Sequence, residues 1–173
     1  MNMFHRSGYR HQRVTMANAG FTMVEVMVAL LIFTISLLGL AGLQAASLRD
    51  NQSALLNSTA AQLISSMGER IRANPEGASA GGYLVDSSSG ASPEPPPANC
   101  YTGQCSPAQI AASDAYEWLS AVSSRLPSAS GKVTSNGDVY TVSVTWRSES
   151  GGGGGNGCNA PQGFTCLQIQ VRL

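Results

Sequence analysis

The feature that most constrains this chain is an uncharged stretch near its N-terminus. Residues 26–48 contain no Asp, Glu, Lys or Arg and consist mostly of Val, Leu, Ile, Ala and Phe. A helix needs about 20 such residues to cross the roughly 30 Å hydrocarbon core of a bilayer. The sequence therefore predicts a membrane-spanning helix at about residues 21–48.

Charges before this stretch give the predicted helix an orientation. Arg6, Arg10 and Arg13 precede it, residues 1–20 contain no acid, and no comparable basic cluster follows it closely. Positively charged flanks stay on the cytoplasmic side of a membrane. We therefore expect the N-terminus in the cytoplasm and the remainder of the chain on the periplasmic side.

A cleaved secretory signal peptide, cut near Ala45, is the alternative explanation for the same stretch. The apolar part of such a peptide spans about 7–15 residues and does not begin with an acid. Here the apolar stretch is longer, and Glu25 lies at its head. The membrane helix is therefore the preferred interpretation.

Glu25 is the unusual residue of this segment. A carboxylate at the bilayer centre costs about 2.5–3.5 kcal/mol or more, so such an acid usually has a partner. The simpler interpretation is that Glu25 lies at the interface and only favours the positive end of the helix dipole. Taken by itself, the residue leaves both interpretations open.

The string Gly-Phe-Thr-Met-Val-Glu, from Gly20 to Glu25, follows the basic leader and precedes the apolar stretch. This combination resembles the signal sequence of type IV prepilins and type II secretion pseudopilins. The resemblance implies that a prepilin peptidase cuts between Gly20 and Phe21 and removes residues 1–20. It also implies that Phe21 becomes the N-methylated terminus and that Glu25 serves filament assembly. Glycine before the cut has a physical reason, since a residue without Cβ lets the backbone approach the protease closely.

Further segments resemble the minor pilins known as pilus-modification proteins, the PilV family. They are Gly-Leu-Ala-Gly-Leu-Gln at 39–44, Met-Gly-Glu-Arg-Ile-Arg-Ala-Asn-Pro at 67–75, Pro-Ala-Gln-Ile-Ala-Ala at 107–112 and Tyr-Glu-Trp at 116–118. One departure is that residues 21–74 contain no proline, whereas many major pilins carry a helix-bending proline there. The resemblance implies a structural role in which the chain helps to initiate or prime a pilus at or near its tip. A type II secretion minor pseudopilin and a tip module that presents an adhesin remain alternatives.

The same resemblance implies partners and a location. Before assembly the chain would be a single-pass protein of the inner membrane with a periplasmic head, and afterwards part of an extracellular pilus. Its partners would be other minor and major pilins, bound through the N-terminal helix, together with the prepilin peptidase and a tip adhesin. No cofactor and no metal are expected.

The helix is expected to continue past the membrane to about Ala73. Apolar residues recur there at intervals of three and four, as on one face of a helix: Leu56, Ala60, Leu63, Met67 and Ile71. Pro75 ends the helix, because the residue before a proline is pushed out of helical geometry. The mature chain is thus divided into a long helix over residues 21–75 and a head domain over residues 76–173.

The head is predicted to begin with a loop and a helix. Residues 76–99 are rich in Gly, Ser and Pro and predict an irregular loop. Ser106 followed by Pro107 is typical of a helix start, and Pro127 predicts where that helix stops.

Strands are predicted after this helix. Asn136-Gly137 indicates a hairpin between a strand around Val133 and a strand at residues 139–146. Alternating residues 166–173 predict a closing strand, and the glycine-rich residues 150–157 predict a loop. The predicted fold class is α+β and pilin-like, in which the long helix packs against an antiparallel sheet of three or four strands.

The head contains all four cysteines: Cys100, Cys105, Cys158 and Cys166. Disulfides are the simplest use of paired cysteines in a small, loop-rich domain of an oxidising compartment, and four cysteines allow three connectivities. We prefer Cys100–Cys105 with Cys158–Cys166, because each bond then closes a loop poor in apolar residues. A zinc site is disfavoured because the spacings match no usual zinc pattern.

Enzymatic and nucleic-acid-binding functions find little support in the residues. Both histidines, His5 and His11, lie in the leader, so the mature chain could not build a Ser-His-Asp or Cys-His arrangement. The glycine run at 151–155 lacks the Lys-Ser/Thr of a phosphate loop. Lys132 is the only lysine, and the basic residues form no stripe for DNA. We therefore predict a protein that is not an enzyme and has no nucleic-acid partner.

Overall fold

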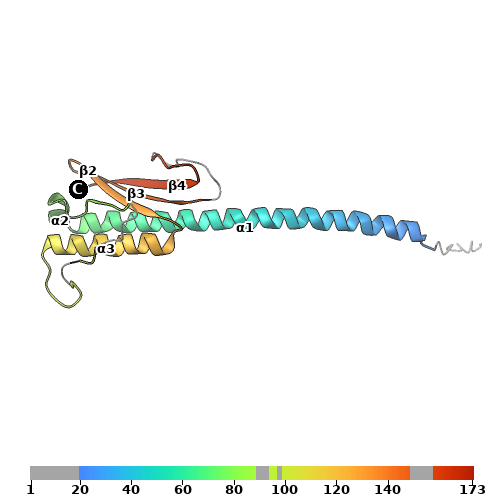
Figure 1. The fold of residues 1–173 in the computed structure, drawn as a ribbon, viewed down its shortest axis with the longest axis horizontal. Coiled ribbons are helices and arrows are strands. Elements are labelled where there is room, and N and C mark those ends of the chain that lie inside the picture. Colours follow the sequence, from blue (N-terminus) through green and yellow to red (C-terminus); the bar gives the residue numbers. More distant parts are fainter. Residues whose placement is uncertain (1–19, 89–93, 97–98, 149–157) are drawn as a thin grey trace, which may run out of the picture. The chain divides into compact units, whose positions relative to one another are not determined.

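The structure, a computed structural model, describes residues 20–88, 94–96, 99–148 and 158–173. The predicted leader, apart from Gly20, and the whole of the predicted glycine-rich loop at residues 150–157 lie outside the described residues. The elements are the helices α1 (Met23–Ala73), α2 (Pro75–Ser79) and α3 (Pro107–Arg125) and the strands β1 (Val85–Asp86), β2 (Ser130–Asn136), β3 (Val139–Arg147) and β4 (Phe164–Arg172) (Figure 1). The chain divides into two compact units, Met1–Ala45 and Ala46–Leu173.

The described part of the N-terminal unit is essentially the first half of α1. Thr22 begins this helix as an N-cap residue does, because its hydroxyl oxygen accepts a hydrogen bond from the Glu25 backbone N–H at 3.3 Å. Every residue from 20 to 45 is exposed. By length and composition, α1 can cross a membrane.

Two hydroxyl side chains interrupt the apolar surface of this segment. Thr34 Oγ1 donates to the Leu31 carbonyl oxygen at 2.8 Å, and Ser36 Oγ donates to the Ile32 carbonyl oxygen at 2.9 Å. Serine and threonine in helices commonly bond to the preceding turn in this way. Both groups therefore find their acceptors within their own helix.

In the C-terminal unit, the second half of α1 lies alongside α3 (Figure 1). The predicted apolar stripe is confirmed: Ala60, Leu63, Met67 and Ile71 are buried, and Leu56 packs against them. The α3 helix begins at the predicted Ser106 cap and carries a full capping box with Gln109. It is tied to α1 by Trp118, whose indole Nε1 donates to the Leu63 carbonyl oxygen at 2.9 Å.

The four strands form one antiparallel sheet in the order β1-β2-β3-β4, so the predicted α+β fold is confirmed. One face is buried, and β3 alternates on it as predicted, with Tyr140, Val142, Val144 and Trp146 directed into the core. The other face of the strand is only partly covered. The period-two pattern of the sequence therefore describes this strand well.

Two glycines mark where the sheet comes closest to the helices. A methyl group on Gly68 of α1 would lie 2.9 Å from Val171 Cγ2 of β4. One on Gly131 of β2 would lie 2.6 Å from the Trp118 ring of α3. The sheet therefore packs on both helices, and at these two places only a hydrogen atom fits without a shift.

The irregular loop predicted at residues 76–99 was wrong in part, because α2 and β1 lie within it. The cause is Asn74, whose side chain accepts a hydrogen bond from the Gly77 N–H at 3.0 Å and restarts a helix immediately after α1. The β1 strand is too short to show a sequence period, and it is held by pairing Val85 with Val133.

The hairpin is present, but its turn is displaced by one residue. Asn136 still belongs to β2 and pairs with Val139, so the loop residues are Gly137 and Asp138. Gly137 has φ +60°, and glycine at the first loop position is typical of a type II′ turn. The closing strand β4 begins at Phe164, earlier than predicted.

Candidate functional site

The first candidate site is the start of α1, where the predicted processing and assembly residues lie. Gly20 and Phe21 precede the helix and are exposed, and Phe21 has 84% of its surface accessible. Glu25 lies in the first turn and is exposed. The ion pairs among the described residues involve Arg70, Arg72 and Lys132, so none of them includes Glu25.

The helix that follows presents large apolar side chains on all sides. Met27, Leu31, Phe33 and Leu38 are each at least 60% exposed. Burying such a side chain releases about 1.5–3 kcal/mol, and a continuous exposed apolar surface of this size marks a membrane or protein interaction site. This segment therefore requires lipid or other helices around it.

The second candidate site is a polar cluster between α1 and α3, formed by Arg70, Asn74, Tyr83, Asp114 and Glu117. Arg70 Nη1 contacts Asp114 Oδ1 at 2.5 Å and Glu117 Oε2 at 3.0 Å. The buried Tyr83 hydroxyl donates to Asp114 Oδ2 at 2.7 Å. Asn74 Nδ2 donates to the Pro107 carbonyl oxygen at 2.8 Å and so joins the end of α1 to the start of α3.

Burial and neighbouring charges shift several pKa values in and around this cluster. Burial raises the pKa of the Tyr83 hydroxyl well above its ordinary value, and its hydrogen bond to Asp114 adds to the rise. Burial lowers the pKa of Arg70, but its bonds to Glu117 and Asp114 outweigh burial, so the net shift is upward. Tyr83 therefore stays neutral and Arg70 stays charged. In these states their hydrogen bonds and ion pairs hold α1 and α3 together.

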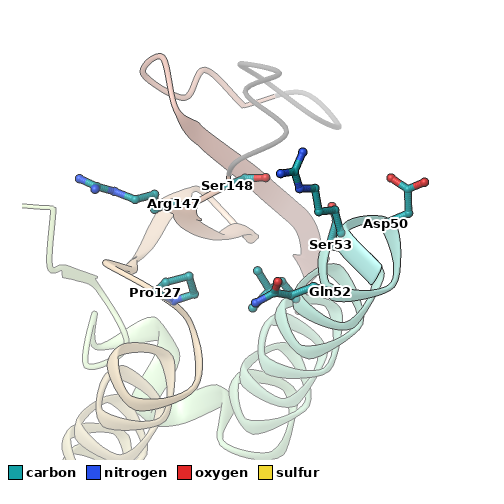
Figure 2. A pocket seen from close by; sticks show the side chains of 8 residues that line it. Asp50, Gln52, Ser53, Pro127, Arg147 and Ser148 are labelled. Carbon is teal, nitrogen blue, oxygen red and sulfur yellow. The ribbon is translucent and has the colours of Figure 1, made fainter. Parts of the chain in front are cut away.

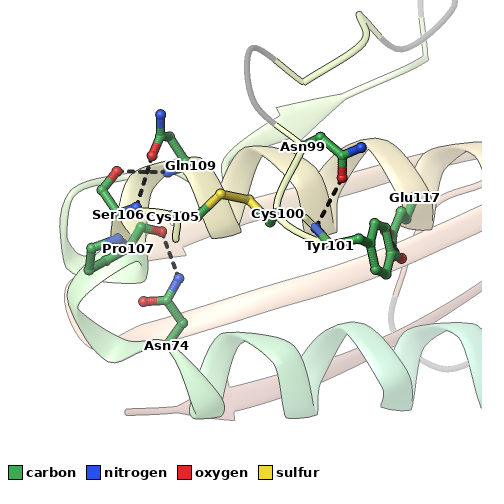
Figure 3. The surroundings of a disulfide bond; sticks show 9 residues. All are labelled: Asn74, Asn99, Cys100, Tyr101, Cys105, Ser106, Pro107, Gln109 and Glu117. Atoms are coloured by element: carbon green, nitrogen blue, oxygen red, sulfur yellow. Dashed lines mark hydrogen bonds between the residues drawn. A yellow bond between two sulfur atoms is a disulfide. The ribbon is translucent and has the colours of Figure 1, made fainter. Parts of the chain in front are cut away.

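The first disulfide, Cys100–Cys105, closes a loop next to this cluster (Figure 3). The Tyr101 backbone N–H donates to Asn99 Oδ1 at 3.0 Å, and the Tyr101 hydroxyl donates to a Glu117 carboxylate oxygen. This hydrogen bond, followed by the ones to Arg70, holds the pKa of Glu117 below its ordinary value against the opposing effect of burial. Tyr101 is held at both ends, although 83% of its surface is exposed.

The second disulfide joins Cys158 to Cys166 of β4. Both preferred pairings are therefore the ones in the structure, and the described residues contain no free cysteine. Nor do the described residues contain a group of three or more His, Cys, Asp or Glu side chains that could hold a metal ion.

A pocket of about 460 Å³ lies between α1 and the end of β3 (Figure 2). Its lining residues come from two segments far apart in the sequence: Arg49, Asp50, Gln52, Ser53 and Leu56 from α1, and Pro127, Arg147 and Ser148 from the other wall. We refer to it as the α1–β3 pocket.

The sequence did not indicate the polar cluster or the α1–β3 pocket. Tyr83 lies in the segment predicted to be an irregular loop, and Arg70 looked like one polar position of an amphipathic helix. The interval from Asp114 to Glu117 offered the one signal, since residues three apart lie on the same helix face. Nothing in the sequence placed that face opposite Arg70.

Comparison with known proteins identifies two matching family models. Residues 42–116 match the Tt1218-like family, described as type IV pilin Tt1218, and residues 15–41 match the prokaryotic N-terminal methylation motif. No curated protein and no solved structure matches the chain. The motif match contains Gly20, Phe21 and Glu25, and the longer match contains both Arg70 and Asp114.

Proposed function

Because residues 42–116 match a type IV pilin family model and residues 15–41 match the N-terminal methylation motif, we propose that this chain is a type IV pilin and, more narrowly, a minor pilin that helps to initiate filament assembly at or near the tip. The observation that carries this proposal is the start of α1, where Phe21 precedes the helix, Glu25 lies in its first turn, and the first half of the helix is exposed on every side. Pilins are structural filament subunits, and this surface suits burial first in a bilayer and then among other pilin helices.

The minor role rests on the resemblance to the PilV family. Two of the segments that carry this resemblance, residues 67–75 and 107–112, meet in the structure through the bond from Asn74 to the Pro107 carbonyl oxygen. These two segments, far apart in the sequence, are thus in contact in the C-terminal unit. This connection supports the assignment to that family of minor pilins.

Abundance and loss of function test the minor role. We expect deletion of the gene to reduce the number of filaments while the bulk subunit of the remaining filaments stays the same, and restoring the gene should reverse the effect. Quantitative mass spectrometry of purified filaments should detect this chain as a trace component. Its presence as the main filament mass would contradict the proposal, and a secretion defect with normal filaments would indicate a type II secretion pseudopilin.

Glu25 is assigned a role in docking between subunits. Cleavage after Gly20 leaves a positively charged amino group on Phe21, which lies just before α1. Its four-residue offset from Glu25 corresponds to roughly 6 Å at the rise of a helix. Neighbouring helices staggered by about that distance bring the Glu25 carboxylate of one subunit beside the terminal amine of another. Leaving such a charge buried without its partner costs about 3–5 kcal/mol, so the pair favours one register of assembly.

The substitution Glu25→Gln keeps the shape of the side chain and removes its charge. We expect cleavage to N-methyl-Phe21 and membrane insertion to remain normal, as checked by intact mass and by resistance to carbonate extraction. Co-purification with partner pilins should fall about tenfold or more, consistent with the loss of a buried ion pair. Unchanged association and filament number would leave Glu25 as an interfacial residue without an assembly role.

A further inference from the structure

The α1–β3 pocket has the chemistry of an anion site. Its lining offers a guanidinium group from Arg49, an amide from Gln52 and hydroxyl groups from Ser53 and Ser148. Figure 2 shows the Ser148 hydroxyl pointing towards α1 and the Gln52 side chain reaching towards Pro127 across the pocket. A guanidinium group binds phosphate oxygens through strong, charge-assisted hydrogen bonds, and neutral hydroxyl and amide groups can donate further ones.

The other two charged lining residues do not oppose this chemistry. The Asp50 carboxylate points away from Pro127, and the Arg147 side chain extends away from α1 (Figure 2). The Arg147 guanidinium lies over the Phe164 ring instead, 5.7 Å from its centroid. Arg49 is therefore the cation left to serve the pocket, and Leu56 and Pro127 supply the apolar part of its lining.

The position of Arg49 along α1 indicates where the anion comes from. Arg49 is the first charged residue after the uncharged stretch that ends at Leu48. Headgroups add about 5–8 Å to each side of a bilayer's hydrocarbon core, and the helix rises about 6 Å from Arg49 to Ser53. When residues 26–48 span the membrane, these two residues lie at the depth of the lipid phosphates.

We propose that the α1–β3 pocket binds the phosphate headgroup of an anionic phospholipid in the leaflet from which the head emerges. The volume of about 460 Å³ falls within the range of small-ligand pockets, about 300–1,000 Å³, and exceeds what a single phosphate group fills. The bound lipid fixes the C-terminal unit against the bilayer surface before assembly. The inference rests on the membrane-anchored state in the proposed function and adds a ligand to it.

Photo-crosslinking of the mature full-length chain in lipid nanodiscs tests this proposal. The bilayer is phosphatidylcholine with a small fraction of phosphatidylglycerol that carries a photoreactive group beside its glycerol phosphate. We expect crosslinks on the peptides that contain residues 49–56 and Ser148. Arg49→Gln should reduce them about fivefold, the effect of one arginine near an anionic membrane surface.

Two further variants separate a pocket from a general charge effect. Ser53→Trp fills the pocket without changing the charge and should lower crosslinking as much as Arg49→Gln does. Arg125→Gln removes one charge at the end of α3, outside the pocket, and should leave crosslinking unchanged. Disulfide mapping of each variant checks that the head is folded.

Three results would overturn the proposal. They are an equal loss with Arg125→Gln, no loss with Ser53→Trp, and full competition by soluble glycerol phosphate, which would make the ligand a free anion. Carbonate extraction separates this failure from failure of the proposed function. A chain that does not stay embedded overturns the anchored state and this proposal with it, whereas an embedded chain without labelled pocket peptides overturns this proposal alone.

Discussion

The two halves of α1 belong to one helix but differ in what surrounds their side chains. In the first half, Leu38 is 75% exposed and a methyl group on Gly39 would touch nothing within 4 Å. In the second half, Met67 is fully buried and a methyl group on Gly68 would lie 2.9 Å from Val171. The same secondary structure therefore serves a surface kept for other molecules and a surface already used by the fold.

This difference shows where the stability of the protein resides. Buried apolar contacts stabilise the C-terminal unit within a single chain, whereas the first half of α1 gains its contacts only from lipid or other subunits. Substitutions in the second half should therefore change unfolding of the monomer, and those in the first half should change insertion or assembly.

The largest expected effect follows from Trp118→Ala. It removes a buried ring and the bond from Nε1 to the Leu63 carbonyl oxygen, so the free energy of unfolding should fall by about 3–5 kcal/mol. Denaturant unfolding of the detergent-solubilised chain, followed by Trp146 fluorescence, would measure it. Leu38→Ala is the control in the exposed half and should change the free energy of unfolding by less than about 0.5 kcal/mol. Equal losses in the two variants would contradict the difference between the two halves of α1.

A smaller effect is expected from a pair of matched glycine substitutions. Gly68→Ala and Gly39→Ala each gain about 1 kcal/mol in helix propensity. At Gly68 the new methyl group collides with Val171, and overpacking of this kind costs about 1–3 kcal/mol. The unfolding free energy of Gly68→Ala should therefore lie about 1–3 kcal/mol below that of Gly39→Ala in the same denaturant assay. Equal unfolding free energies of the two variants would show that α1 and β4 move apart at this point at little cost.

The smallest expected change in the free energy of unfolding comes from removing the charge of Glu117 in the polar cluster, and this change depends on pH. Bonding to Tyr101 and Arg70 lowers the pKa of Glu117, so its stabilising contribution is full above its unfolded pKa of about 4.3. That contribution is lost as the pH falls through the lower pKa of the folded state.

Glu117→Gln should therefore reduce the unfolding free energy at pH 7 by less than about 1 kcal/mol, the range of partly exposed ion pairs. The difference from the unsubstituted protein should shrink as the pH is lowered to 3, which a series of denaturant curves would show. Glu69→Gln is the control, because its pair with Arg72 is exposed on both sides. A difference that grows in acid would contradict the assigned sign.

The sequence predicted the elements whose periodicity is long or whose caps are distinctive. The α1 helix, the Ser106 cap of α3 and the alternation of β3 follow from local chemistry that a single segment expresses. The sequence did not predict elements that depend on a cap formed directly after another helix or on pairing with a distant segment. Asn74 restarts a helix where proline suggested a loop, and β1 is defined by its pairing with β2, far along the chain.

The candidate sites divide in the same way. Gly20, Phe21 and Glu25 form a contiguous motif, so their proposed role was readable from their order alone. Arg70 and Asp114 are 44 residues apart in the chain, and their meeting depends on how α3 packs against α1. The α1–β3 pocket likewise joins Arg49 to Ser148, which no local pattern connects.

The hydroxyl groups of Thr34 and Ser36 have a consequence for how the subunit moves. Each donates to a carbonyl oxygen of its own helix. Both hydroxyl groups are therefore hydrogen-bonded without water and without a partner protein. Transfer from lipid into a bundle of apolar helices then exchanges one nonpolar neighbourhood for another, with the same internal hydrogen bonds before and after. Thr34 and Ser36 therefore add no polar cost to either step of the proposed assembly, so any such cost in this helix lies at Glu25.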